Sequence, residues 1–186
     1  MKIFTSLLLT FYYPKAGVDN IHKESKIFLI AIVFLLLCSV ASAATLKVGS
    51  KEKYKTIQSA VNASQNGDTI KVAYGTYDEV VNIDKWDLTI LGTKYPKVDG
   101  FYFQGGSGTI NGFSLQKYGI STNFAGGGTI RNNYFYNCGI YLGGPTGDCT
   151  IINNKIFGGT IFLSDTYESV IKGTTVSNSK CGLCID

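Results

Sequence analysis

Three carboxylates lie close together in the stretch NGDTIKVAYGTYDEVVNI at residues 66–83. Asp68, Asp78 and Glu79 carry the groups that general acid and base catalysis requires, because a carboxylic acid and a carboxylate can pass a proton to and from a substrate. A structural alternative is that Asp68 accepts hydrogen bonds from turn amides while Asp78 and Glu79 lie beside the start of a strand. We favour the structural interpretation.

The later acids are sparse, and only Asp148 and Asp165 lie near a basic residue in the sequence, the single arginine Arg131. Both aspartates fall in predicted loops, where solvated charge is the preferred interpretation over a catalytic pair. The only histidine, His22, precedes the predicted mature domain, so that domain has no imidazole base. We therefore predict no catalytic residue and no cofactor.

Four cysteines follow the N-terminal segment. Cys181 and Cys184 have a metal-ligand spacing, but a tetrahedral zinc site requires a second pair, and Cys138 and Cys149 are eleven residues apart. Strand alternation also places Leu183 inward and Cys184 outward, which separates Cys184 from Cys181. We predict buried thiols at Cys138 and Cys149, with a disulfide somewhere in the chain as the alternative, and no metal site.

The elements that position these groups repeat at about 20 residues. Isoleucines recur at steps of 20 or 21, at Ile70, Ile90, Ile110, Ile130, Ile151 and Ile171. Two further apolar columns follow in the later repeats, one at Ile120, Ile140, Ile161 and Leu183 and the other at Leu115, Phe135, Ile156 and Val176. The short alternating runs are typical of strands, and no repeat contains a helical stretch.

Glycine or asparagine follows each later isoleucine by two residues, at Gly112, Asn132, Asn153 and Gly173. These residue types tolerate a left-handed backbone, so the column predicts a turn. A repeat of this length needs its neighbours to bury an apolar face. The pattern predicts an all-β, single-stranded parallel β-helix of about six coils of about 20 residues. The pattern L-x-x-L-x-L of leucine-rich repeats is absent.

The segment TIQSAVNAS at residues 56–64 spaces Ile57, Ala60 and Val61 at i, i+3 and i+4, which predicts a helix with one apolar side. We expect this helix to cap the N-terminal end of the β-helix, where an uncovered strand edge would promote association.

The segment at residues 54–92 resembles the N-terminal module of right-handed β-helix proteins in the pectin-lyase-like superfamily. The resemblance rests on TIQ at residues 56–58, GDTI at residues 67–70 and GTY at residues 75–77, with Tyr74 in place of the usual proline. The following repeats resemble those of archaeal and bacterial cell-surface proteins. The resemblance implies a right-handed β-helix, whereas the superfamily hosts many activities. The acid clusters of its lyases, hydrolases and esterases are not seen in this sequence.

Outward aromatic side chains are the candidate ligand contacts. Because Phe135 takes an inward position, Tyr134 and Tyr136 point outward, and Tyr141 and Phe162 should stack on adjacent coils of another face. Flat rings can stack on the rings of a polysaccharide or cell-wall glycan, and they can also simply pack across strands. Both interpretations remain open, and these four residues form the predicted ligand-binding set.

The N-terminus resembles a secretion signal. Residues 22–43 combine a basic stretch, an apolar core and an Ala-Ser-Ala cleavage site, which predicts a signal peptide, or a membrane anchor if the segment is retained. Residues 1–21 form an N-terminal extension that a start site assigned too far upstream would explain. The β-helix domain is predicted at residues 44–186, with a secreted or cell-surface location.

The predicted function is that of an exported structural or adhesive domain that binds carbohydrate without catalysis. The alternative is the N-terminal part of a polysaccharide lyase or hydrolase whose catalytic coils lie downstream. Because solenoids normally need a cap, we expect further coils or a partner chain to cover the C-terminal end. Residues 45–186 contain 12 Lys and one Arg against 11 acids, a net charge of 13 − 11 = +2, without a basic stripe that would indicate nucleic-acid binding.

Overall fold

The computed structural model describes residue 32 and residues 43–123, 127–144 and 146–186. Residues 43–186 form one compact unit. The predicted extension at residues 1–21 lies outside the described residues, as does the predicted signal peptide at residues 22–43 apart from Ile32 and Ala43. Within the described ranges, no helix combines the length and the apolar character needed to cross a bilayer.

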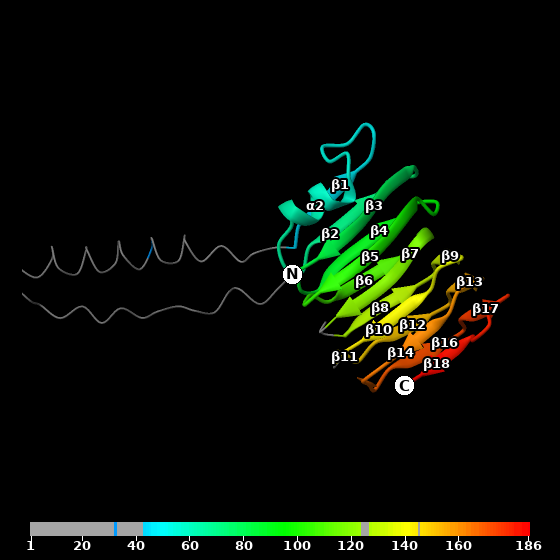
Figure 1. Ribbon diagram of the computed structural model, residues 1–186. Helices are drawn as coiled ribbons and strands as arrows, with labels where there is room; N and C mark the ends of the chain where they lie inside the picture. Colours follow the sequence, from blue (N-terminus) through cyan, green and yellow to red (C-terminus); the bar gives the residue numbers. More distant parts are fainter. Residues whose placement is uncertain (1–31, 33–42, 124–126, 145) are drawn as a thin grey trace, which may run out of the picture. The chain divides into compact units, whose positions relative to one another are not determined.

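The first sheet contains the predicted isoleucine column. Its seven parallel strands are, in order, β1 (Thr45–Val48), β2 (Thr69–Val72), β4 (Leu88–Gly92), β6 (Gly108–Asn111), β8 (Gly128–Arg131), β12 (Thr150–Ile152) and β16 (Val170–Lys172) (Figure 1). The six isoleucines from Ile70 to Ile171 pair in register, as predicted. A seventh rung precedes them, because Leu46 pairs with Ile70. The sequence period does not reveal it, since a helix lengthens this first coil.

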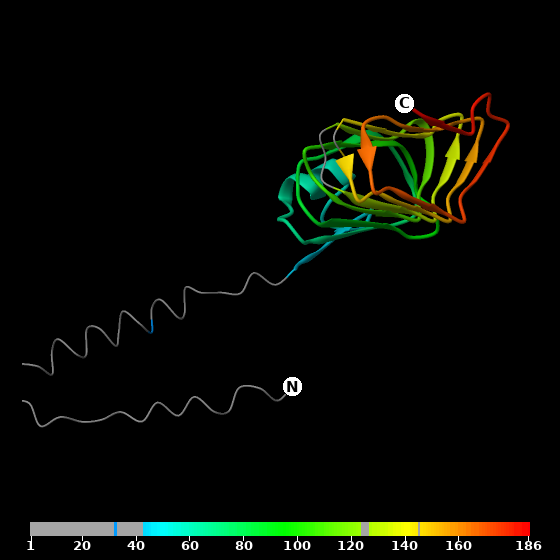
Figure 2. The same ribbon diagram turned by 90° about the horizontal axis from the view of Figure 1, so that it is seen from below.

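The second sheet closes each coil around the interior (Figure 2). The early coils contribute the long strands β3 (Thr76–Ile83), β5 (Lys97–Gln104) and β7 (Ser114–Asn123). The later coils contribute two short strands each, β9 (Tyr134–Tyr136) with β10 (Ile140–Gly143), β13 (Lys155–Phe157) with β14 (Ile161–Leu163), and β17 (Thr175–Ser177) with β18 (Leu183–Ile185). A third, two-stranded sheet pairs β11 (Thr146–Gly147) with β15 (Thr166–Tyr167). The all-β parallel β-helix is confirmed.

The two other predicted apolar columns are also in register. Ile120, Ile140, Ile161 and Leu183 form one ladder, and Leu115, Phe135, Ile156 and Val176 form the other. Glycine marks the corner between them, because a β-carbon on Gly139 would collide with the carbonyl oxygen of Thr160 on the next coil. Position 139 must therefore lack a side chain, whereas the equivalent position of the next coil is Thr160.

The predicted turn column adopts the left-handed backbone at all four positions. The φ angles are +84° at Gly112, +54° at Asn132, +52° at Asn153 and +63° at Gly173. The residue that follows each turn points inward, and in two coils it is a buried asparagine, Asn133 or Asn154. This buried pair is a feature that the sequence analysis missed.

The two buried asparagines connect successive coils. The Asn133 side-chain oxygen accepts from the Phe113 amide at 2.9 Å, and the Asn154 side-chain oxygen accepts from the Asn133 amide at 3.0 Å. Their amide nitrogens donate to the carbonyls of Ile110 and Ile130 at 3.1 and 2.8 Å. Because buried polar groups without partners are costly, this ladder lets polar side chains occupy the interior of the turn.

Helix α2 (Ile57–Ala63) covers the first coil with the apolar side that the sequence predicts, since Ile57, Ala60 and Val61 are buried (Figure 1). The Thr56 hydroxyl caps its N-terminus by accepting from the Ser59 amide at 3.2 Å. The Gln58 side chain bonds to both backbone groups of Asn82, accepting at 2.7 Å and donating at 3.1 Å. The helix therefore supplies hydrogen bonds as well as apolar cover.

Candidate functional site

Two of the three early acids, Asp68 and Glu79, bind backbone amides, whereas Asp78 is exposed on β3. Asp68 is buried, and its carboxylate accepts from the amides of Ala44 at 2.7 Å and Gln65 at 2.8 Å. The turn-amide role predicted for Asp68 is confirmed. Because the side chain is buried and both oxygens accept backbone amides, this carboxylate holds the chain together and does not face a substrate.

Glu79 holds the N-terminal end of α2 from a neighbouring strand. One oxygen accepts from the Ile57 amide at 2.7 Å and the other accepts from the Gln58 amide at 3.0 Å. An anion is stabilised at this end of a helix, where amides lack intrahelical partners. Burial, together with the charge of Glu79, raises the pKa of Tyr77, whose hydroxyl donates to the Ala73 carbonyl at 2.9 Å. This group is therefore a packed and neutral part of the first coil.

The later acids do not assemble around Arg131. Asp148 and Asp165 are both exposed at turn positions with φ near +50°, at 53° and 52°. The ion pairs found in the described part of the chain, Lys85–Asp84 and Lys117–Asp99, involve neither aspartate. Within the described ranges, no group of three or more His, Cys, Asp or Glu side chains converges in a way that could hold a metal ion.

The cysteines divide between the interior and the last coil. Cys138 and Cys149 are buried free thiols, as predicted, and burial raises the pKa of Cys138 to about 11 and also raises that of Cys149. Cys181 and Cys184 form a disulfide with their α-carbons 6.2 Å apart. The prediction that strand alternation separates them is wrong, because Cys181 precedes β18 and is not constrained by its alternation.

Tyr134 and Tyr136 lie on β9, and their rings have different neighbours. Tyr134 is half-buried, packs edge-on against Tyr95 with ring centroids 4.8 Å apart, and has the Lys155 ammonium 5.5 Å from its ring. Tyr136 is 42% exposed and stacks on Phe157 with centroids 5.5 Å apart and planes 14° from parallel. We call Tyr136 and Phe157 the aromatic pair.

The other two predicted aromatics lie on different strands. Tyr141 of β10 and Phe162 of β14 pair in register, as predicted, with Tyr141 exposed and Phe162 half-buried. The four predicted residues therefore form two groups. Phe157 was missed, although it follows the inward Ile156 as Tyr136 follows Phe135, so the same alternation would have predicted it.

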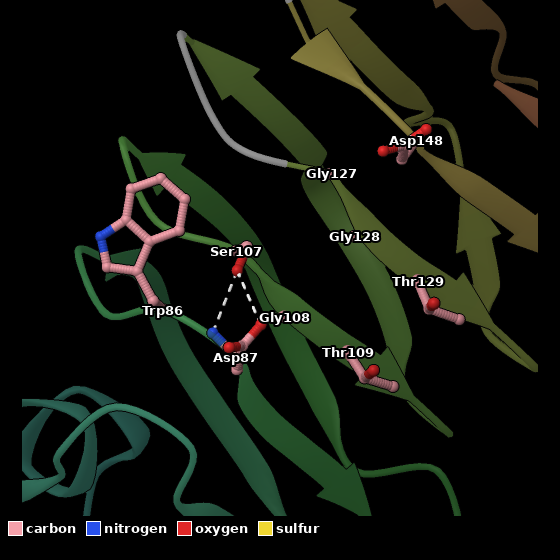
Figure 3. Close-up of a pocket in the computed structure, with 9 residues that line it drawn as sticks. All are labelled: Trp86, Asp87, Ser107, Gly108, Thr109, Gly127, Gly128, Thr129 and Asp148. Atoms are coloured by element: carbon pink, nitrogen blue, oxygen red, sulfur yellow. Dashed lines mark hydrogen bonds between the residues drawn. The ribbon is translucent and has the colours of Figure 1, made fainter. Parts of the chain in front are cut away.

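A groove of about 570 Å³ lies at the edge of the first sheet (Figure 3). Its side-chain lining consists of Trp86, Asp87, Ser107, Thr109, Thr129 and Asp148. Between Trp86 and Asp148 lie first Ser107 and Gly108 and then Gly127 and Gly128, and these last two glycines form the floor beside Asp148 (Figure 3). The Ser107 hydroxyl lies 3.0 Å from the Asp87 amide and 3.3 Å from its carboxylate.

The groove was not predicted, yet its positions follow the repeat. The first sheet contains a column of threonines that pair in register, Thr89, Thr109, Thr129 and Thr150. The residues two positions before them line the groove, namely Asp87, Ser107, Gly127 and Asp148. Listing the residues at this offset would have placed two carboxylates and a hydroxyl on one line parallel to the coil axis. Trp86 stands next to the first of them.

The comparisons with known proteins identify a family. The family described as "Periplasmic copper-binding protein (NosD)" matches residues 52–186, which include helix α2 and all later coils. Searches of the curated proteins and of the solved structures give no significant match. The periplasmic description supports the exported location predicted from the N-terminus. Because this match covers most of the chain, the chain belongs to the NosD family.

Proposed function

We propose that this chain is an exported, non-catalytic β-helical scaffold that binds polysaccharide or cell-wall glycan. The observation that carries the proposal is the aromatic pair, in which two partly exposed rings stack on adjacent coils of one face. The stacked rings cover one face of each other, so the pair offers its ring edges and its two outer faces at a fixed spacing. Neighbouring parallel strands are about 4.8 Å apart, so the rings are held by the backbone and not by a mobile loop.

Sugar rings suit this surface because one face of a pyranose is apolar and can lie against an aromatic ring. Aromatic stacking contributes roughly 0.5–1.5 kcal/mol per pair beyond area burial. Lys155 lies two residues before Phe157 on the same strand, with its ammonium 5.5 Å from the neighbouring Tyr134 ring. Together these groups favour adhesion to a repeating glycan more than enclosure of a small molecule.

The absence of catalysis is proposed from the state of the acids. Asp68 and Glu79 are occupied by backbone amides, and Asp165 stands alone at an exposed turn. Glycoside hydrolysis uses two carboxyl groups placed on either side of the bond to be broken. Apart from Asp87 and Asp148, which line one groove, the described coils supply scaffold carboxylates and isolated surface carboxylates, and we propose a binding role for the chain.

Copper binding, which the family description names, does not fit the described residues. Copper is bound in proteins chiefly by thiolate, thioether and imidazole groups. The described ranges contain neither histidine nor methionine, because His22 and Met1 lie outside them. Their cysteines are either buried thiols with raised pKa values or joined in a disulfide. We therefore assign no copper to these coils.

The test is affinity for a panel of immobilised polysaccharides, measured with the full chain. We expect binding to at least one glycan and a loss of about tenfold or more in the Tyr136→Ala/Phe157→Ala double variant. Tyr118→Ala is the matched control, because Tyr118 is 63% exposed and lies outside the aromatic pair. Equal losses in the control and in the double variant would overturn the assignment of the site.

Catalysis is tested separately by incubating the chain with polyuronates and neutral polysaccharides. We expect neither unsaturated products nor new reducing ends. Turnover would contradict the non-catalytic part of the proposal and would favour the polysaccharide lyase or hydrolase alternative.

A further inference from the structure

We propose that the groove beside Trp86 binds a glycan chain carrying free amino groups and rejects polyuronates. The proposal rests on the proposed glycan binding for its ligand class, but it concerns a second site. The groove lies along the first sheet, whereas the aromatic pair lies on the second.

The shape of the groove suits part of a chain molecule. It is shallow and open to solvent, with a volume of about 570 Å³, so it can contact one side of a chain that continues beyond it. Packing between coils keeps the floor free of side chains. A β-carbon on Gly127 would lie 2.5 Å from the Gly147 carbonyl oxygen, and one on Gly128 would lie 2.8 Å from the Gly108 oxygen. The open floor is therefore a fixed property of the stacked coils.

Trp86 provides an aromatic wall whose backbone is anchored. Its backbone amide donates to the Asn66 side chain at 3.0 Å, and its carbonyl accepts from the Gly67 amide at 2.9 Å. These bonds anchor the backbone to the preceding coil, while 48% of the residue remains exposed. Tryptophan is the best aromatic partner for a cation and also stacks on sugar rings. A protonated amino sugar offers both features in one unit.

The charge of the groove selects among glycans. Of its described lining residues, Asp87 and Asp148 are charged, and both are acidic. Within the described residues, the Asp148 carboxylate makes no ion pair, and it is exposed, so an ammonium group can donate to it. Two carboxylates attract a cationic chain and repel the carboxylates of a polyuronate. The hydroxyls of Thr109 and Thr129 can donate to or accept from sugar hydroxyls.

The test compares three hexamers by isothermal titration calorimetry with the full chain at low salt: a glucosamine oligomer, its N-acetylated counterpart and an oligogalacturonate. We expect the glucosamine oligomer to bind at least tenfold more tightly than the N-acetylated one, and the oligogalacturonate not to bind. Trp86→Ala should weaken binding of the glucosamine oligomer at least tenfold. Asp148→Asn should remove most of the preference for the free amine.

Asp165→Asn is the matched control, because Asp165 is also exposed at a left-handed turn but lies outside the groove, and it should leave binding unchanged. If the glucosamine oligomer still bound to Trp86→Ala but not to the Tyr136→Ala/Phe157→Ala variant, the groove would not be its binding site. The proposed function at the aromatic pair would still stand. Oligogalacturonate binding that depends on Trp86 would overturn the charge argument. If none of the three hexamers bound, the proposal that the groove binds a glycan would be wrong. The polysaccharide panel would then be the test of whether the chain binds glycans at the aromatic pair.

Discussion

The covered coils and the last coil place the same residue types in different environments. By covered coils we mean those with a neighbour on both sides, whether another coil or helix α2, and by last coil we mean residues 170–185. Ile110 and Ile171 occupy the same column of the first sheet, yet Ile110 is 0% exposed and Ile171 is only partly buried. Burial in this fold thus depends on the neighbouring coil more than on the residue itself.

The first coil shows what a cover accomplishes. Helix α2 lies over it, and Val48 of β1 is fully buried. In the last coil, Val170 is 53% exposed and Ile185 is 73% exposed. One helix of seven residues, held by Glu79 and Gln58, therefore protects a coil as a full neighbouring coil would.

The largest expected effect compares Ile110→Ala with Ile171→Ala. Ile110→Ala should lower the free energy of unfolding by about 3 to 4 kcal/mol, because it leaves a cavity between two coils. Ile171→Ala should cost about 1 kcal/mol, because its site is already partly open to water. Urea unfolding followed by circular dichroism measures both. Equal losses would show that the last coil is covered as the others are.

The interior columns could be predicted because each inward residue pairs with an inward residue about 20 positions later. The Leu46 rung could not, because helix α2 lengthens the first coil to 24 residues between Leu46 and Ile70 and breaks the period. Asn133 and Asn154 were missed for another reason. Each follows another Asn in a turn, and only the stacking of coils shows that the second one points inward.

The candidate sites divide in the same way. The outward direction of Tyr136 follows from alternation along one strand, so the sequence predicts it. The groove requires Trp86 and Asp148 to flank two glycines, and these residues come from separate coils. The site exists because glycines, which have no side chain, lie between the two walls. A search of the sequence for clusters of reactive residues does not find such a space.

The second effect concerns the thiols of the covered coils. Burial raises the pKa of Cys138 from 9.0 to about 11. Between these two pH values, the thiol is protonated in the folded chain and ionised in the unfolded chain. Its contribution to stability is complete below the ordinary thiol pKa and is lost as pH rises through 9 to about 11. Between about pH 8.5 and 10.5, the free energy of unfolding should fall by about 2 kcal/mol more in the wild type than in Cys138→Ala.

Urea unfolding at several pH values measures this difference. Because all other titratable groups are the same in both proteins, the comparison isolates Cys138. Identical pH dependence in the two proteins would show that the Cys138 site is reached by water, as the last coil is.

The third effect removes part of the cover from the first coil. Glu79→Gln keeps the size of the side chain but removes the charge that accepts from the Ile57 and Gln58 amides. We expect a loss of about 1 to 1.5 kcal/mol, in the range of a helix cap with a charged acceptor. Asp78→Asn is the control at the neighbouring exposed position and should change stability by less than about 0.5 kcal/mol. Thermal unfolding of the two variants would show whether α2 depends on this contact.

The smallest expected effect is reduction of the Cys181–Cys184 disulfide. The bond closes a loop of only four residues, for which the chain-entropy estimate is about 2 kcal/mol, and it lies in a coil with a neighbour on one side only. Because such a coil can open without the others, reduction should raise hydrogen exchange in β18 strongly while lowering the stability of the covered coils by less than about 1 kcal/mol. Hydrogen exchange with peptide resolution, with and without reductant, separates the two quantities, and the Cys181→Ser/Cys184→Ser variant should reproduce the reduced state. If exchange rose equally in β18 and in β9, the coils would unfold as one unit. The last coil and the covered coils would then differ in solvent exposure but not in local stability.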